Sequence, residues 1–259
     1  MWDLDKWQEI LASIGKHKLR TVLTAFGVAW GIFMLVLLLG AGRGLHHGIA
    51  YQFEGDAVNS LWVMTGRTSK PFRGLGEGRR IRLNNDDYDF LIEELDQIEG
   101  LSGKYFISGD KVVKYKDKSI RYPVQGIHPD GAKAEATKIT RGRLINQQDL
   151  EQTRKVAVFG GIAAEQIFGD DDPIGKEVSI DNVVYKVIGV YVDTEGEWAM
   201  KRIYLPISTV QKVYSSYDRI DQLIVLAGDM SYPDMLDLED QTRETVSYTH
   251  LTLPTIYSV

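Results

Sequence analysis

The stretch TVLTAFGVAWGIFMLVLLLGAG, residues 21–42, has no charged side chain, whereas 25% of the 259-residue chain is charged. As a helix it would extend about 33 Å, which matches the roughly 30 Å hydrocarbon core of a bilayer. Buried helices of soluble proteins usually keep a polar edge over such a length, and a cleaved signal peptide has a shorter apolar core that begins nearer the terminus. The stretch therefore predicts a retained transmembrane helix, which we place at residues 19–45.

Positively charged residues gather before this helix. Lys6, Lys16, Lys18 and Arg20 lie within about 20 residues upstream, whereas Arg43 alone lies within the same distance downstream. Because loops rich in Lys and Arg stay in the cytoplasm, we expect a cytoplasmic amino terminus. The rest of the chain is then expected outside the inner (plasma) membrane.

The residues before the helix show an amphipathic pattern. Leu4, Trp7, Leu11 and Ile14 recur every three or four positions, with polar residues between them. This spacing predicts a short cytoplasmic amphipathic helix over residues 1–18. Such a helix could lie on membrane lipid or pack against a partner helix.

Glycines within and after the apolar run are candidates for close helix packing. Gly27 and Gly31 are four residues apart, and Gly40, Gly44 and Gly48 repeat that spacing along one face. Small residues at this spacing let two membrane helices approach closely, although glycine is also common in membrane helices generally. We therefore expect helix–helix contacts at these positions.

Composition and motifs argue against several functional classes. A net charge of −6 gives no electrostatic basis for binding nucleic acid, and the absence of cysteine excludes disulfides and thiolate sites. The sequence contains no G-x-x-x-x-G-K-[ST] loop, no H-E-x-x-H and no G-x-S-x-G. Asp193, Glu195 and Glu197 alternate as an acid–base pair might, but Gly196 favours an exposed loop. We predict no enzyme and no catalytic, cofactor-binding or metal-binding residue.

The region after the apolar helix, residues 46–245, mixes strand and helix patterns. Strands are expected at 59–65, 104–108 and 111–116, and SIRYPVQGI, residues 119–127, is expected to follow the hairpin turn KDKS. Helices are expected at 86–97 after Asn85, at 162–168 and at 233–246. Irregular alternation of this kind predicts an α+β domain.

Two segments resemble a known family. The segment KHKLRTVLTAFGVAWGIFMLVLLLGAGRGL, residues 16–45, is similar to the first transmembrane helix of MacB/FtsX-type ABC transporter permeases. The segment GRLINQQDLEQTRKVAVFGGIAAEQIFGDDDPIGKEVSIDNVVYKVIGVY, residues 142–191, resembles their MacB-like periplasmic core domain. Its shared features are a G-R-x-[FLI] turn, an aspartate a few residues on, KVAVFG, PIGK and a V-I-G-V strand, and IYLPISTVQ at 203–211 resembles the next stretch of that domain.

The resemblance implies a homodimeric permease that works with a separate cytoplasmic ABC ATPase subunit, with or without a periplasmic adaptor protein. It also implies a βαβ-type membrane-proximal part, at about 55–118 and 212–246, and an inserted β-rich part at about 119–211. Such permeases resemble levers that turn ATP hydrolysis into motion outside the membrane, for export or extraction of a substrate.

The end of the chain departs from the family pattern. No second uncharged run follows the outer domain, although the family has three more membrane helices there. Residues 246–259, VSYTHLTLPTIYSV, do not look like the family, so we predict a non-family tail on a truncated permease. The alternative is a single-pass, membrane-anchored binding or sensor protein.

Overall fold

The computed structural model describes most of the chain in two units, Met1–Gln52 and Phe53–Val259. The residues it describes are 18–53, 60–64, 66, 76–78, 82–95, 97–135, 137–193, 196–250 and 255–258. The amphipathic helix predicted before Lys18 lies outside them.

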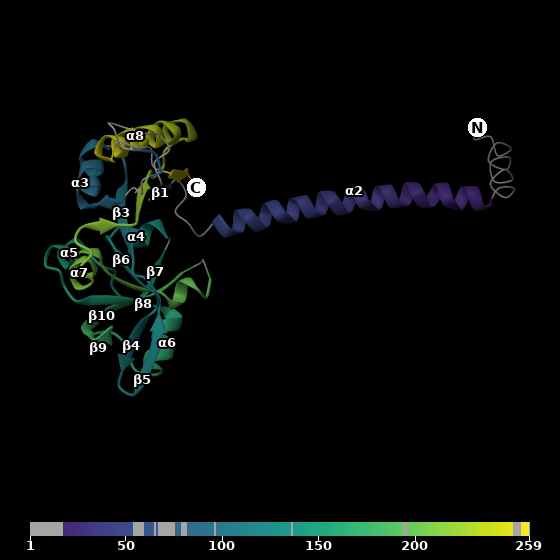
Figure 1. Cartoon of the computed structure of the whole chain (residues 1–259). Coiled ribbons are helices and arrows are strands. Elements are labelled where there is room, and N and C mark those ends of the chain that lie inside the picture. The colour runs from purple at the N-terminus through teal and green to yellow at the C-terminus, as the bar shows by residue number, and fades with distance from the viewer. Residues whose placement is uncertain are drawn as a thin grey trace. The chain divides into compact units, whose positions relative to one another are not determined.

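The described part of the first unit is one helix, α2 (Lys18–Phe53), which continues unbroken for 36 residues (Figure 1). Its window Lys18–Gly42 has a mean hydropathy of 2.5, and no share of it is buried. Apolar side chains point in every direction around the axis, and Leu19, Phe26 and Leu38 are all more than 60% exposed. Of the described helices, α2 is the one long and apolar enough to cross a membrane, which confirms the predicted apolar helix.

The second unit is built on a mixed sheet of twelve strands, with helices packed against it (Figure 1). The strand order is β14-β1-β13-β3-β6-β11-β8-β10-β9-β4-β5, and β7 pairs with β10. Pairs β6–β11 and β8–β10 are parallel and the other pairs are antiparallel. The predicted α+β class is therefore confirmed. The strands are β1 (Ser60–Met64), β3 (Gly100–Phe106), β4 (Lys111–Tyr115), β5 (Lys118–Tyr122), β6 (Val124–Ile127), β7 (Lys138–Gly142), β8 (Val156–Gly160), β9 (Glu177–Ile180), β10 (Val183–Val192), β11 (Ile203–Pro206), β13 (Gln222–Leu226) and β14 (Thr255–Ser258).

Helices cover this sheet, and two short strands form a second, separate pair. The pair is β2 (Leu83–Asn84) with β12 (Arg219–Ile220). At one end of the sheet α3 packs against α8, and further along α7 packs on β6 while α6 packs on β4, β5 and β8. The helices are α3 (Asn85–Glu94), α4 (Gly131–Ala134), α5 (Gln147–Glu151), α6 (Gly161–Phe168), the 3₁₀ turn η1 (Ala199–Lys201), α7 (Ile207–Val213) and α8 (Tyr232–His250).

Alternation along the strands divides the apolar residues between the two faces of the sheet. On β1, Leu61 and Val63 belong to the main core, whereas Trp62 packs with Ile224 and Leu226 on the opposite face. Side chains of a strand point alternately to the two faces, so each face has its own buried cluster. Both faces of the sheet are covered.

Two local predictions differ from the structure. SIRYPVQGI is not one strand, because Pro123 separates β5, which pairs with β4, from β6, which lies between β3 and β11. Proline has no N–H to donate to a ladder, so it marks the point where the chain changes partner. Asn84, not Asn85, caps α3, in a capping box with Asp87.

The predicted internal boundaries cross continuous elements. The β4–β5 hairpin spans residue 118 and pairs through β4 with β9, so it belongs to the sheet region assigned to the insert. At the other end, α8 runs through residue 246 to His250, and Val246 is buried in the main core. β14 pairs with β1. The non-family origin of residues 246–259 stays a prediction.

Candidate functional site

The glycines predicted for helix packing divide into two sets on α2. Gly27 and Gly31 are separated by about 40° around the axis, but Gly40 follows nine residues later, about 180° away. Gly40 and Gly44 therefore form a second notch, nearly opposite the first. A Cβ added at Gly27, Gly31 or Gly40 would meet nothing within 4 Å, so glycine is not required by contacts within the described chain. The helix contact remains a prediction.

Two of the four orientation-setting cations are placed by the structure. Lys18 and Arg20 lie exposed in the first turn of α2. Lys6 and Lys16 lie outside the described residues. Both placed cations thus lie just before the uncharged run, which begins at Thr21, as predicted.

Three charged side chains lie buried together in the second unit. Lys104 and Arg202 both donate hydrogen bonds to Oε1 of Glu135. The distance from Nη1 of Arg202 to this oxygen is 3.0 Å. Side-chain exposures are 2% for Lys104, 4% for Glu135 and 3% for Arg202. We call these three residues the buried charge cluster.

Aromatic side chains enclose this cluster. The Tyr204 hydroxyl donates to the other carboxylate oxygen of Glu135, and Tyr191 stacks on Tyr204 with ring centroids 5.0 Å apart. The ring of Trp62 lies 4.7 Å from Lys104 Nζ, and that of Trp198 lies 4.1 Å from the Arg202 guanidinium carbon. These cation–π contacts complete the shell around the two cations.

The buried charge cluster and its aromatic shell connect elements that are far apart in the sequence. Lys104 lies on β3 and Trp62 on β1, whereas Tyr204 lies on β11 and Tyr191 on β10. The Tyr191 hydroxyl also donates to the carbonyl of Ala199 and so fixes the η1 turn. The cluster thus links β3 to the start of β11 through Glu135, across the intervening strand β6.

The electrostatics of the cluster favour an ionised Glu135. Burial by itself would raise the pKa of the Glu135 carboxyl, but the charges of Lys104 and Arg202 outweigh it and lower that pKa. Burial and the neighbouring Glu135 charge raise the pKa of the Tyr204 hydroxyl well above its ordinary value. Tyr204 therefore stays neutral and donates. The cluster is an internal hydrogen-bonded network with a structural role.

The Gly-Arg motif and its following aspartate form a second charged structure. The Arg143 guanidinium binds both oxygens of Asp149, at 2.5 and 3.0 Å, while Asp149 also closes a capping box with Asn146. Gly142 has a φ of +74°, and a Cβ there would lie 2.1 Å from the Ile188 carbonyl oxygen. The motif therefore sets a turn and holds α5.

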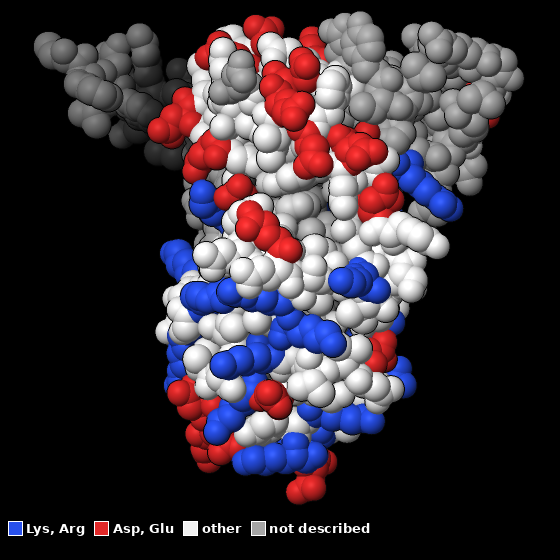
Figure 2. Space-filling view, turned by 90° about the vertical axis from the view of Figure 1, so that its left-hand side faces the viewer, with Lys and Arg blue, Asp and Glu red and all other residues white. Residues whose placement is uncertain are grey.

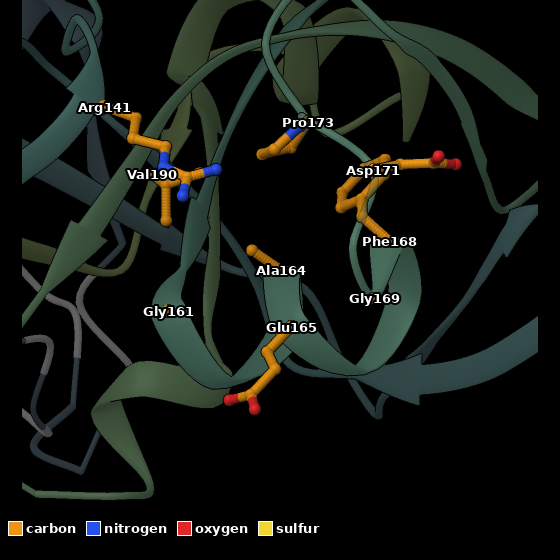
Figure 3. A pocket seen from close by; sticks show the side chains of 9 residues that line it. All are labelled: Arg141, Gly161, Ala164, Glu165, Phe168, Gly169, Asp171, Pro173 and Val190. Carbon is orange, nitrogen blue, oxygen red and sulfur yellow. The ribbon is translucent and has the colours of Figure 1, made fainter.

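A pocket of about 250 Å³ lies beside α6 (Figure 3). Ala164, Phe168, Pro173 and Val190 supply apolar lining, and Arg141 reaches over it. Glu165 points away from the pocket, and Asp171 is turned outward, where it pairs with Lys116. Its polar groups do not converge on one point. Within the described residues there is also no group of three His, Asp or Glu side chains able to hold a metal ion.

The alternating acidic residues do not form a pair. Asp193 is 8% exposed, so its predicted place in an exposed loop is wrong, whereas Glu197 is 82% exposed and lies 4.0 Å from Lys201. Glu195 lies outside the described residues. Asp193 directly follows the last residue of β10, Val192.

Residues 21–237 match the model of one protein family, the MacB-like periplasmic core domain. The chain belongs to this family. The domain resembles the periplasmic region of MacB from Actinobacillus actinomycetemcomitans, with a TM-score of 0.66 and 22% identity over 80% of this chain and 91% of that one. It also resembles the extracellular domain of the ABC-type transporter YknZ from Gram-positive bacteria, with a TM-score of 0.63 and 14% identity over 78% of this chain and all of that one.

Curated relatives of this MacB-like chain are named as transporters. The macrolide export ATP-binding/permease protein MacB 2 of Aeromonas hydrophila is 26% identical over 91% of this chain and 36% of its own length. The MacB of Chlorobaculum tepidum is 29% identical over 89% of this chain and 39% of its own. The ABC transporter permease YvrN of Bacillus subtilis is 25% identical over 83% and 54%. The chain thus spans well under two thirds of these relatives.

The buried charge cluster was not foreseen from the sequence. Its members are 31 and 67 residues apart, so no local spacing connects them. The one local signal in the MacB-like domain is Lys104, a cation inside the apolar strand LSGKYF. A lysine in a buried strand requires an acidic partner, because an unpaired charge is costly to bury.

Proposed function

We propose that the chain is part of the permease subunit of an ABC transporter. It would couple cytoplasmic ATP hydrolysis to movement of an extracytoplasmic domain, for export or extraction of a substrate. One observation carries this proposal: the match to the MacB-like periplasmic core domain covers residues 21–237, a range that includes an apolar helix long enough to cross a membrane. The protein would act as a homodimer in the inner membrane, with its amino terminus in the cytoplasm and with or without an adaptor protein.

We place ATP hydrolysis outside this chain, in a separate cytoplasmic subunit. The sequence has no phosphate-binding loop of the G-x-x-x-x-G-K-[ST] kind. The relatives named MacB carry ATP-binding and permease functions under one name, whereas YvrN is named as a permease. A test for the ATPase must therefore look both for a separate subunit and for an ATP-binding part of the same polypeptide.

A domain that transmits movement needs stiff internal connections. The buried charge cluster supplies one, because it fixes β3, the end of α4 and the start of β11 to one carboxylate. Interiors are close-packed and transmit strain. We expect this connection to keep β3, α4 and β11 moving as one body.

The orientation is tested by single cysteines, because the chain has none of its own. A membrane-impermeant maleimide applied to intact spheroplasts should label Ser215→Cys, which is exposed in the domain, and should leave Ser13→Cys unlabelled until the membrane is opened. A reporter active only outside the cytoplasm should work when fused after Ala57. The reverse labelling pattern would overturn the proposed topology.

The transporter assignment is tested by purifying the tagged protein from its own organism in mild detergent. A cytoplasmic ABC ATPase should co-purify, or be found as part of the same polypeptide, and its ATP hydrolysis should change when the Glu135→Leu variant replaces the wild type. Recovery of folded protein without any ABC ATPase would instead support the alternative, a single-pass binding or sensor protein.

A further inference from the structure

The turn after α7 holds a tyrosine in solvent. Tyr217 is 90% exposed, more than any other large apolar or aromatic side chain among the described residues. Its φ is +56°, and that of Ser215 is +50°, both in the left-handed region that side chains other than glycine rarely adopt. Such backbone strain concentrates where a structure presents a residue for function.

A shallow pocket of about 400 Å³ lies beside this tyrosine. Ser208, Gln211, Lys212, Ser215 and Tyr217 line it, and the exposed side chains of Ser215, Lys212 and Tyr217 offer two hydroxyls and one ammonium group. Lys212 is exposed and forms no ion pair with any described residue. We call these five residues the α7 patch.

The base of the α7 patch is rigid. The Gln211 amide exchanges two hydrogen bonds with the Asn85 side chain on α3, at 2.8 and 3.2 Å. The Ser208 hydroxyl donates to the carbonyl of Leu150 on α5. Because α7 is fixed to two neighbouring helices, the backbone that carries the patch is formed in advance, which lowers the ordering cost of binding.

Charge is distributed unevenly on this side of the molecule, although some Asp and Glu also lie at the lower end of the view. Figure 2 shows Asp and Glu over its upper part, the level at which Figure 1 places α3 and α8, and Lys and Arg below them, at the level of α5, α7 and β10. The exposed acidic residues of the two helices are Asp86, Asp89, Glu93, Glu94, Asp234, Asp237 and Asp240. The α7 patch lies on the basic side, just below this acidic pair of helices.

We propose that the α7 patch binds an acidic segment of a partner protein. Lys212 would pair with a carboxylate of that segment, and the exposed ring of Tyr217 would pack on its apolar side chains. Tyrosine is one of the residues enriched among the anchors of protein interfaces. An anionic membrane surface fits less well, because it is broad and would also face the acidic residues of α3, to which Asn85 ties the patch.

The test uses the full chain in neutral detergent and a fluorescein-labelled, glutamate-rich peptide that contains one phenylalanine. Its anisotropy should show binding that weakens as ionic strength rises. Lys212→Glu and Tyr217→Ala should each weaken that binding roughly tenfold. Lys138→Glu, an identical charge change at an exposed position on β7, should leave it unchanged. Both patch residues are exposed, and circular dichroism would verify that the variants fold.

Several outcomes would overturn the proposal. Equal weakening by Lys138→Glu would show that net charge and not the α7 patch attracts the peptide, and equal binding of a lysine-rich peptide would exclude an acidic partner. Vesicles of phosphatidylglycerol that bind the chain through Lys212 more strongly than the peptide would assign the patch to lipid. Self-association that Lys212→Glu abolishes would assign it to a second copy of this chain.

Discussion

Two lysine–carboxylate pairs of this domain have similar contacts and opposite surroundings. The pair Lys104–Glu135 has side chains 2% and 4% exposed, whereas in Lys116–Asp171 they are 63% and 41% exposed. In water a pair gains little because solvent and salt screen it, while a buried pair must repay the loss of hydration with further contacts. Arg202 and Tyr204 supply those contacts to Glu135. The same kind of ion pair therefore contributes little at Lys116–Asp171 but connects distant elements at Lys104–Glu135.

The largest expected effect is at Glu135. Glu135→Leu leaves Lys104 and Arg202 buried without their carboxylate, so we expect the free energy of unfolding to fall by about 3–5 kcal/mol. Urea titration of the full chain in detergent would measure this. Tryptophan fluorescence is a suitable signal because Trp62 and Trp198 contact the two cations. Asp171→Leu is the matched control, and equal losses in both variants would remove the distinction between the sites.

The next prediction concerns a buried histidine, His128, whose burial outweighs the nearby charge of Asp130. His128 stacks on Tyr88, accepts a hydrogen bond from the Gly103 N–H, and has its pKa lowered by burial to about 4. As the pH falls, the His128 imidazole takes up a proton near pH 6.5 in the unfolded chain, but only near pH 4 in the folded chain. Stability should thus be intact above about pH 6.5 and fall as the pH drops toward 4, by about 3 kcal/mol from this group.

The variant His128→Asn isolates that contribution. An asparagine oxygen can accept the same N–H bond but does not titrate in this range. The wild type minus the variant should therefore show a stability difference that changes with pH between about 4 and 6.5. A difference that stays constant over this range would show that His128 titrates normally.

An intermediate effect is expected at Asp149, whose side chain is fully buried while its partner Arg143 is 43% exposed. Burial would raise the pKa of the Asp149 carboxyl, but the hydrogen bond from Arg143 outweighs this, and the pKa is lowered. Asp149→Asn should therefore lose about 2 kcal/mol at neutral pH, and the loss should shrink as the pH falls below the ordinary aspartate range. Asn146→Ala, which removes only the cap, should cost about 1 kcal/mol.

The smallest effect is expected at the surface pair. Lys116→Met should leave the urea midpoint unchanged within error, at low and at physiological salt, because Lys116 is open to solvent. A clear loss of stability would show that the β4–β5 hairpin depends on Asp171 more than its exposure indicates. Thermal unfolding of the same variant would provide an independent check.

Much of the fold follows from local sequence. The uncharged run predicts α2, the KDKS turn predicts the β4–β5 hairpin, and alternating patterns predict an α+β domain, all of which the structure contains. The predicted strand boundaries were less accurate where one residue marks the point at which the chain passes from one neighbouring strand to another. Pro123 divides one expected strand into two that join different neighbours.

The candidate sites were likewise predicted only in part from the sequence. Glycine spacing in the run indicates helix packing, and the unbroken helix then shows that Gly31 and Gly40 face nearly opposite directions. Asp193 was expected in an exposed loop, yet it is buried, because exposure depends on what packs around a loop. The strain at Tyr217 has no signature in sequence, since serine and tyrosine do not favour a positive φ.

The sequence by itself determined the apolar helix, the order of cations around it and the class of the domain, because these depend on neighbours within a few residues. Tertiary structure alone decided which distant residues meet. Glu135 joins Lys104, 31 residues before it, to Arg202, 67 residues after it, and Gln211 joins Asn85 across 126 residues. Periodicity describes which face of an element is apolar, whereas the partner of a buried charge is fixed only when the sheet brings its strands together.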